Sequence, residues 1–271
     1  MFATDRSMGI VDLARAAEER GFHALYLPEH THIPTSRKTP PPTGQAELPE
    51  EYKRTLDPFV ALAAAAAVTT RLRLGTGVSL VAQHDPIVLA KAVATIDLIA
   101  NGRMVLGIGF GWNEDEMAQH GVPYKQRRDI GREKVLAMQR LWADDVAEFH
   151  GAHVHLEPTW SWPKPIARRV PVLLGGAPGP KLFAHIAEYC DGWIPIGGSG
   201  VKASLPDMRR AAEEAGRDPD TLCVLPFGVL PDRGKLDYYA SLGITEVALR
   251  LPSAPADVVL RKLDEYAASL L

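Results

Sequence analysis

The chain alternates between segments of helical periodicity and short apolar runs. Apolar residues recur on one face from residue 8 to residue 20, and Gly21 then supplies a favourable helix stop. The apolar runs are typical of strands that are buried on both faces. Seven strands are predicted, at residues 22–27, 72–80, 104–108, 170–174, 191–196, 221–230 and 246–251.

A helix is predicted after each of these strands, and one further helix precedes the first of them. Alternation of this kind indicates an α/β fold with a parallel sheet. A (β/α)8 TIM barrel is favoured over a doubly wound open sheet, because glycines and small residues recur at many strand ends rather than at one switch point. In the third helix, Asp85 and Pro86 are predicted to be the N-cap and the first helical residue.

An eight-stranded barrel requires a strand before the first helix, and residues 1–3 are predicted to be at most a stub of it. We expect one domain over residues 1–271. Two stretches interrupt the alternation. Residues 31–56 are polar and proline-rich, as in an active-site lid, and residues 144–169 are predicted to form a hairpin followed by an irregular loop.

Composition narrows the classes of function. With 46% hydrophobic residues, 23% charged residues and a formal net charge of −3, the 271-residue chain is globular and has no electrostatic reason to bind nucleic acid or an anionic membrane. Its longest apolar run, residues 59–68, is half of the ~20 residues that a spanning helix needs. Residues 1–7 have no apolar segment of a secretory signal, and two cysteines are too few for a disulfide framework, so a cytoplasmic protein is expected.

Candidate chemistry gathers at the predicted carboxyl ends of the strands. His30 is the acid/base candidate, because an imidazole can give or take a proton near neutral pH, and Glu29 beside it could orient the ring. The alternative interpretation is a loop histidine next to a surface glutamate.

Glycines follow the other strands, where they would let the backbone approach a flat or phosphorylated ligand. Trp112 stands where a dinucleotide fingerprint would need its third glycine. Free N–H groups before the helix at 180–189 could bind a phosphate. Ordinary strand–helix turns are the alternative interpretation. The candidate cofactor-binding residues are Thr76, Gly77, Val78, Gly109, Phe110, Gly111, Trp112, Asn113, Gly175, Gly176, Ala177, Gly197 and Gly198.

No metal site is expected. His150, His153 and His155 lie close together in sequence, but no cysteine or carboxylate spacing completes a recognisable site.

One combination of motifs resembles a known family. Its parts are Asp85-Pro86, Ala90-Lys91, Ala94-Thr95, Gly102-Arg103, Leu106-Gly107-Ile108-Gly109 and Gly111-Trp112. The chain resembles the luciferase-like monooxygenase superfamily, and within it the branch of coenzyme F420-dependent oxidoreductases common in actinobacteria.

The resemblance implies a (β/α)8 barrel with the cofactor ring over the strand ends and its phosphate near the fifth and sixth strand–helix loops. It implies a non-prolyl cis peptide at Gly77-Val78, and His30 as the proton donor or acceptor. Trp112 would lie near the ring, at a position where some relatives have a catalytic glutamate.

The expected function is therefore F420-dependent hydride transfer to or from a small organic substrate. Two alternatives stay open: an FMN-dependent monooxygenase that uses O2, and a non-catalytic flavin-binding protein. A homodimer is an expectation of the family. The substrate is not fixed by the sequence.

Overall fold

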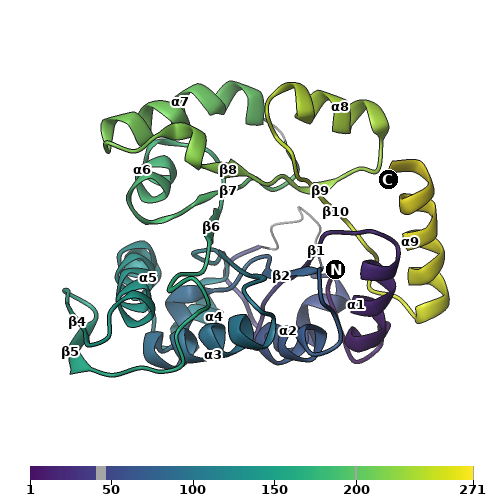
Figure 1. Ribbon diagram of the computed structural model, residues 1–271. Coiled ribbons are helices and arrows are strands. Elements are labelled where there is room, and N and C mark those ends of the chain that lie inside the picture. Colours follow the sequence, from purple (N-terminus) through teal and green to yellow (C-terminus); the bar gives the residue numbers. More distant parts are fainter. Residues whose placement is uncertain (41–46, 199, 271) are drawn as a thin grey trace.

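The computed structural model of the chain describes residues 1–40, 47–198 and 200–270. Residues 41–46 of the predicted lid therefore lie outside the described part. Within it, a curled parallel sheet is surrounded by helices (Figure 1).

Six strands form the main sheet, in the order β1-β2-β3-β6-β7-β8, and every neighbouring pair is parallel. A parallel pair, β9 and β10, extends the curl through a bridge between Ile196 and Phe227. The strands are β1 (Ala24–Leu27), β2 (Arg73–Thr76), β3 (Met104–Ile108), β6 (Val172–Gly175), β7 (Gly192–Ile194), β8 (Cys223–Val224), β9 (Phe227–Val229) and β10 (Ala248–Leu249).

The strand predicted at 221–230 is broken into β8 and β9 because Pro226 has no N–H to donate. The ladder continues on both sides of it, where Leu225 N donates to Trp193 O (2.9 Å) and Phe227 N donates to Pro195 O (2.9 Å). Counted as one strand, β8 and β9 bring the parallel strands of the described residues to the seven expected.

The sheet stays open between β1 and β10 in the described part of the chain. Residues 1–9 contribute one isolated bridge, Thr4 with Thr55, and the Met1 ammonium donates to Tyr26 O (3.3 Å). The structure thus shows a curled half-barrel, and the closed eight-stranded barrel of the expectation is not seen in the described residues.

Helices pack on the outside of the curl. Asp57 and Asp85 cap α2 and α3, each accepting two backbone N–H bonds at 2.9 Å, and Gly21 ends the α1 region with a φ of +83°. The α-helices are α1 (Ile10–Glu19), α2 (Pro58–Ala66), α3 (Pro86–Ile99), α4 (Glu114–Gln119), α5 (Arg127–Ala143), α6 (Pro180–Tyr189), α7 (Val201–Glu214), α8 (Arg233–Ser241) and α9 (Ala256–Leu270).

Two of the three buried apolar clusters lie against the sheet. The large outer core lies between sheet and helices, whereas a smaller inner cluster fills the inside of the curl. The inner cluster consists of Tyr26, Val105, Leu173, Ile194 and Leu225. Side chains on alternate strand positions therefore serve opposite cores, which explains why the strands are apolar throughout.

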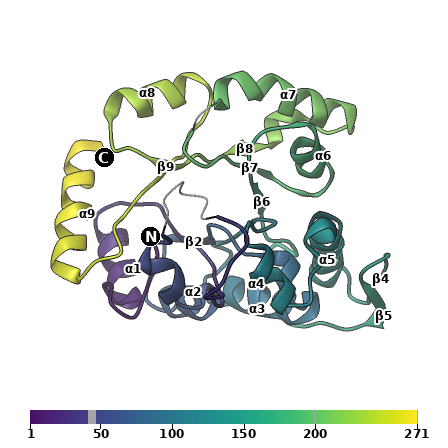
Figure 2. The same ribbon diagram turned by 180° about the vertical axis from the view of Figure 1, so that it is seen from behind.

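The remaining features lie at the periphery. An antiparallel hairpin of β4 (Ala147–His150) and β5 (His155–Thr159) projects beyond α5, as predicted for residues 144–169 (Figure 2). Helix α9 packs beside α1, so both ends of the chain lie on one side of the molecule. Among the residues described, no helix is long and apolar enough to span a membrane.

Candidate active site

The predicted site residues follow strands that all point the same way, so they gather at one edge of the curled sheet. His30 comes after β1, Val78 after β2, Trp112 after β3 and Gly198 after β7. We call this edge the carboxyl edge.

His30 is held by a carboxylate that sequence reasoning missed. Its Nδ1 lies 3.0 and 3.1 Å from the two carboxylate oxygens of Glu116, on α4. Both side chains are buried, at 7% and 1% exposed. A carboxylate only accepts hydrogen bonds, so Nδ1 carries a hydrogen, and Nε2 has no hydrogen-bond partner within the described residues. The pair therefore fixes the orientation of the imidazole, as acid/base chemistry would require.

The expectation that Glu29 orients His30 is wrong. The Glu29 carboxylate accepts from Ser79 Oγ (2.8 Å) and Leu80 N (2.7 Å), and it pairs with His84 Nε2 (2.8 Å). Successive side chains after a strand point in different directions. The Glu29 side chain therefore points into the protein, and the His30 side chain points towards α4. Glu29 thus holds the segment after β2 in place.

The ionisation of Glu29 reflects this role. Burial raises the pKa of its carboxyl, but the bonds from His84, Leu80 and Ser79 outweigh burial and bring the pKa below its usual value. Glu29 is consequently a structural anion and not a proton carrier at neutral pH.

Aromatic rings surround His30. Its ring centroid lies 5.4 Å from that of Tyr52 and 6.1 Å from that of Trp112, and Tyr52 in turn packs on Phe2 at 4.6 Å. Tyr52 belongs to a short 3-10 helix (Glu50–Arg54) in the lid region, which was not predicted. The imidazole is thus shielded on several sides by apolar surface.

Val78 sits where three strand ends meet. A Cβ on Gly109 would lie 2.6 Å from Val78 Cγ2, and a Cβ on Gly175 would lie 3.0 Å from Val78 Cγ1. Only glycine fits at Gly109, because the Val78 side chain occupies that space. The Gly77-Val78 peptide is cis, as the resemblance implies.

Three of the candidate residues are engaged within the protein. The Thr76 hydroxyl is fully buried and donates to Gly107 O (2.6 Å). The Phe110 ring packs on His185 of α6 (5.3 Å) with Arg128 of α5 over it. The hydroxyl of Thr76 and the ring of Phe110 therefore do not serve a ligand at the carboxyl edge. The Gly198 backbone lies against the Tyr239 hydroxyl.

Asn113 has the opposite character. It is 1% exposed, yet neither polar atom of its side chain has a hydrogen-bond partner in the described structure. It directly precedes α4 but does not cap it. A buried amide without hydrogen-bond partners costs free energy of folding, and a polar group of a bound ligand would supply those partners.

The loops that follow β6 and β7 are rich in glycine. Trp193 Nε1 donates to Gly176 O (2.9 Å), and Gly197 N donates to Phe227 O (2.9 Å). Gly176 and Ala177 precede α6, and Gly197 and Gly198 adopt positive φ values of 78° and 69° before α7. Gly176 N also donates to Ile194 O (3.3 Å), so the N–H groups of Gly176 and Gly197 are already engaged. The N–H groups of Ala177 and Gly198 have no hydrogen-bond partner among the described residues, and groups of this kind bind phosphate.

The described start of the lid docks on α4. Thr31 Oγ1 lies 2.8 Å from His120 Nε2, His32 Nε2 lies 2.7 Å from Gln119 Oε1, and Lys38 N donates to Asp115 (2.6 Å). Burial, and then the neighbouring His32, lower the pKa of His120. The helix that carries Glu116 is therefore also the docking surface of residues 31–40.

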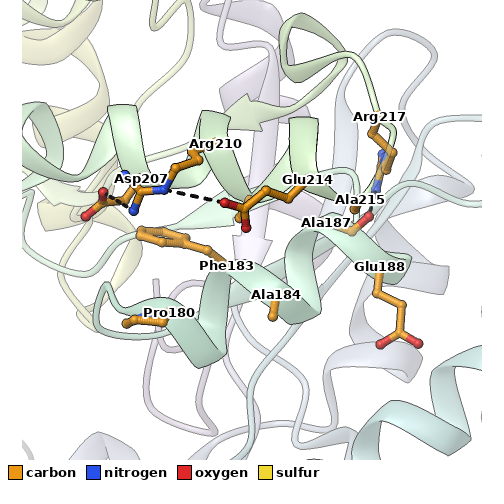
Figure 3. A pocket seen from close by; sticks show the side chains of 11 residues that line it. Pro180, Phe183, Ala184, Ala187, Glu188, Asp207, Arg210, Glu214, Ala215 and Arg217 are labelled. Atoms are coloured by element: carbon orange, nitrogen blue, oxygen red, sulfur yellow. Dashed lines mark hydrogen bonds and ion pairs between the residues drawn. The ribbon is translucent and has the colours of Figure 1, made fainter.

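A cavity of about 580 Å³ lies away from this edge, between α6 and α7 (Figure 3). Arg210 pairs there with Asp207 (2.7 Å) and Glu214 (3.8 Å). None of the candidate site residues lines it. In the described ranges, no group of three or more metal-ligating side chains is present either.

Comparison with known proteins shows which family the chain resembles. A family model described as luciferase-like monooxygenase matches residues 5–232. An uncharacterised protein of Mycobacterium tuberculosis is 43% identical over 275 residues, covering 100% of this chain and 96% of that protein. The F420-dependent glucose-6-phosphate dehydrogenase of Kineococcus radiotolerans is 29% identical over 216 residues, covering 77% of this chain and 59% of that enzyme. The crystal structure of monooxygenase RslO1 from Streptomyces bottropensis superposes with a TM-score of 0.78 at 22% identity, covering 97% and 92% of the two chains.

Proposed function

Because the chain belongs to the luciferase-like monooxygenase family, whose members are flavin- or deazaflavin-dependent oxidoreductases, we propose that it transfers hydride between coenzyme F420 and a small organic substrate. The observation that carries the proposal is the buried His30–Glu116 pair at the carboxyl edge. Hydride transfer to a carbonyl, or from an alcohol, requires a proton to move at the substrate oxygen, and an oriented imidazole does this.

The residues at this edge fit a flat, phosphorylated cofactor. Val78 with Gly109 and Gly175 offers a small apolar platform, and the buried amide of Asn113 lacks partners for its polar atoms. The loops before α6 and α7 would hold the phosphate through backbone N–H groups. A bound deazaflavin would supply the hydride chemistry.

The protein's own part in the reaction is the handling of one proton. Glu116 fixes the His30 ring through Nδ1–H, which leaves Nε2 to give a proton to a substrate oxygen or to take one from it. Tyr52 and Trp112 limit the access of water to the imidazole. Trp112 has no titratable group, so His30 is the proton carrier in this proposal.

A monooxygenase that uses FMN and O2 is the second candidate, favoured by the likeness to RslO1 over nearly the whole chain. A cytoplasmic location completes the proposal, since both cysteines, Cys190 and Cys223, are free.

Titration of the purified protein with F420 and with FMN tests the choice of cofactor. We expect F420 to bind more tightly, and tight binding of FMN without binding of F420 would contradict the proposal.

Turnover of a panel of alcohols and aldehydes would then be followed through the absorbance of F420. His30→Ala should reduce turnover by about 10²–10⁴-fold, whereas His23→Ala, at an exposed histidine, should not. Binding of F420 without turnover of any substrate would favour a non-catalytic carrier.

A further inference from the structure

The exposed face of the β4–β5 hairpin carries two neighbouring imidazoles. His150 and His155 are directly opposite each other in the antiparallel ladder, so their side chains lie on the same face. Their ring centroids are 4.5 Å apart, and the two Nδ1 atoms are 3.1 Å apart. The hairpin lies on the side of the molecule opposite α9 (Figure 1), and it contains none of the candidate active-site residues. The histidine pair is therefore separate from the carboxyl edge.

A carboxylate determines which nitrogen of His155 is free to bind a ligand. Glu157 Oε1 lies 2.8 Å from His155 Nε2. Because a carboxylate only accepts hydrogen bonds, Nε2 carries the hydrogen, and Nδ1 of the neutral ring presents its lone pair to His150. His150 is exposed to water, so its hydrogen can move to Nε2 and leave a second lone pair at Nδ1. A carboxylate that accepts from the outer nitrogen is also the arrangement that supports metal-ligating histidines.

The separation of the two Nδ1 atoms fits a single metal ion between them. With bonds of about 2.0–2.1 Å from metal to imidazole, two neighbouring ligands of one ion lie roughly 2.8–3.4 Å apart, from square-planar to tetrahedral geometry. The observed 3.1 Å falls within this range. Since the χ2 torsion of histidine is soft, small ring rotations would direct both lone pairs at one ion.

The hairpin holds this pair in place. Gly151 N donates to Val154 O (2.8 Å) and closes the turn between the two histidines. Glu133 of α5 accepts from three consecutive backbone N–H groups of this turn, at 2.9, 2.6 and 2.9 Å, and so ties the turn to the helix. On the other face of the hairpin, Leu156 is buried in the outer core. Two ligands fixed in this way lose little conformational freedom when they bind an ion.

The charges on this face also favour a cation. Glu148 and Glu157 are exposed, each two residues from a histidine of the same strand and therefore on the same face. Residues 147–159 include no lysine or arginine. We propose that His150 and His155 bind one divalent metal ion of the kind that prefers imidazole, Zn²⁺ or Cu²⁺, with water completing the coordination. Glu157 is the positioning residue of this site.

Isothermal titration calorimetry of the metal-free protein with ZnCl₂ tests the proposal. We expect one Zn²⁺ per chain, tighter binding of Cu²⁺, and no binding of Mg²⁺, which prefers oxygen ligands. His150→Ala and His155→Ala should each abolish Zn²⁺ binding in the titrated range, because one imidazole alone cannot chelate the ion. His153→Ala, at an exposed histidine of the same turn, is the matched control and should bind as the unaltered protein does.

Glu157→Gln tests the positioning role. It should weaken Zn²⁺ binding about 10-fold, through loss of the carboxylate behind His155. The Tm of the metal-free protein should stay unchanged, because Glu157 is exposed, whereas a merely structural role would lower it.

Hydrogen exchange locates the ion. Zn²⁺ should raise the protection of β4 and β5 and leave that of β3 unchanged, and this rise should disappear in His150→Ala. Absence of Zn²⁺ binding to the unaltered protein would overturn the proposal. So would unchanged affinity in His150→Ala or His155→Ala, with folding verified by circular dichroism, because the ion would then sit at other histidines of the chain. None of these results depends on the reaction proposed for the carboxyl edge.

Discussion

Glu116 determines which nitrogen of His30 is free. Within the described residues its carboxylate contacts one hydrogen-bonding side chain, that of His30, and both are buried. Glu116 is therefore a positioning residue, and its effect should appear in turnover more than in substrate binding.

Glu116→Gln tests this role. Loss of the charge that supports the imidazolium should lower kcat by about 10-fold or more and leave KM nearly unchanged. Steady-state kinetics would measure both constants. Glu114→Gln, at an exposed position of the same helix, is the matched control and should behave as the unaltered enzyme. Equal kcat values for the two variants would remove Glu116 from the mechanism.

The buried Glu29 carboxylate should contribute to the free energy of unfolding in a pH-dependent way. A carboxyl with a lowered folded-state pKa contributes stability that is present above its ordinary pKa of about 4.5 and is lost as the pH falls through the folded-state value. Glu29→Gln should therefore lower the free energy of unfolding at neutral pH, by about 1–3 kcal/mol, and make its decline in acid shallower.

Urea unfolding at a series of pH values would measure both effects. Glu19→Gln, at an exposed residue of α1, should retain the slope of the unaltered protein. An unchanged slope in Glu29→Gln would show that the bonds to Ser79, Leu80 and His84 do not control this ionisation.

At the scale of elements, periodicity predicted most of the sheet and helices. Strands buried on both faces appear in the sequence as short apolar runs, and capped helices are marked by their cap residues. The strand at 221–230 was predicted as one strand, but it is interrupted at Pro226. Proline removes a single hydrogen bond between strands, and the apolar run around it hides this interruption. The strand predicted at 72–80 was also too long, because regular pairing ends at Thr76 and only an isolated bridge, Ser79 with Ile108, continues it.

The gathering of the candidate residues at one edge of the sheet was predictable because it depends on strand ends, whereas contacts between residues distant in sequence were missed. Glu116 lies 86 residues from His30 along the chain, and no local pattern reports such a contact. In the structure Asn113, Glu116 and Met117, at i, i+3 and i+4, are all buried. Only Met117 of the three is apolar, so no hydrophobic periodicity distinguished Glu116 from Glu114 and Asp115.

The docking of residues 31–40 on α4 should depend on pH. Because burial and His32 lower the pKa of His120, the docked state favours the neutral ring, and its stability is lost as the pH falls from about 6.5 through the folded-state value. The negative charges of Glu116 and Glu29 raise the pKa of His120, but more weakly than burial lowers it. The nearby His84 lowers this pKa, as His32 does.

Hydrogen exchange would measure this effect. Protection of residues 31–40 should be lower at about pH 5.5 than at about pH 7.5, after correction for intrinsic rates, whereas β3 should keep its protection. His120→Asn should flatten the dependence in the docked segment. A segment equally protected at both pH values would contradict the role of His120.

At the scale of the molecule, α2 and α3 expose an apolar face. No charged residue occurs in α2, and α3 has two, Lys91 and the buried Asp97. Val60 is 71% exposed and Val88 is 68% exposed. Helices that are apolar on all sides are normally covered on all sides, so we propose that a second copy of the chain packs on this face as a homodimer.

Val88→Glu should convert the dimer to a monomer, because a charge would be buried at the interface. Light scattering after size-exclusion chromatography would give the mass. Val258→Glu, at an exposed valine of α9, should stay dimeric. A monomeric mass for the unaltered protein would refute the homodimer.

The pairing of α1 with α9 has a consequence for synthesis. Arg20 bonds Asp264, 244 residues further along the chain, and Met8 N donates to Ala254 O. During translation α1 leaves the ribosome well before α9, because the contacting residues are 244 positions apart. The surface of α1 that α9 covers therefore stays uncovered until α9 has been synthesised. Complete burial of α1 has to wait for this late contact, and a chaperone bound to α1 would shield the surface in the meantime.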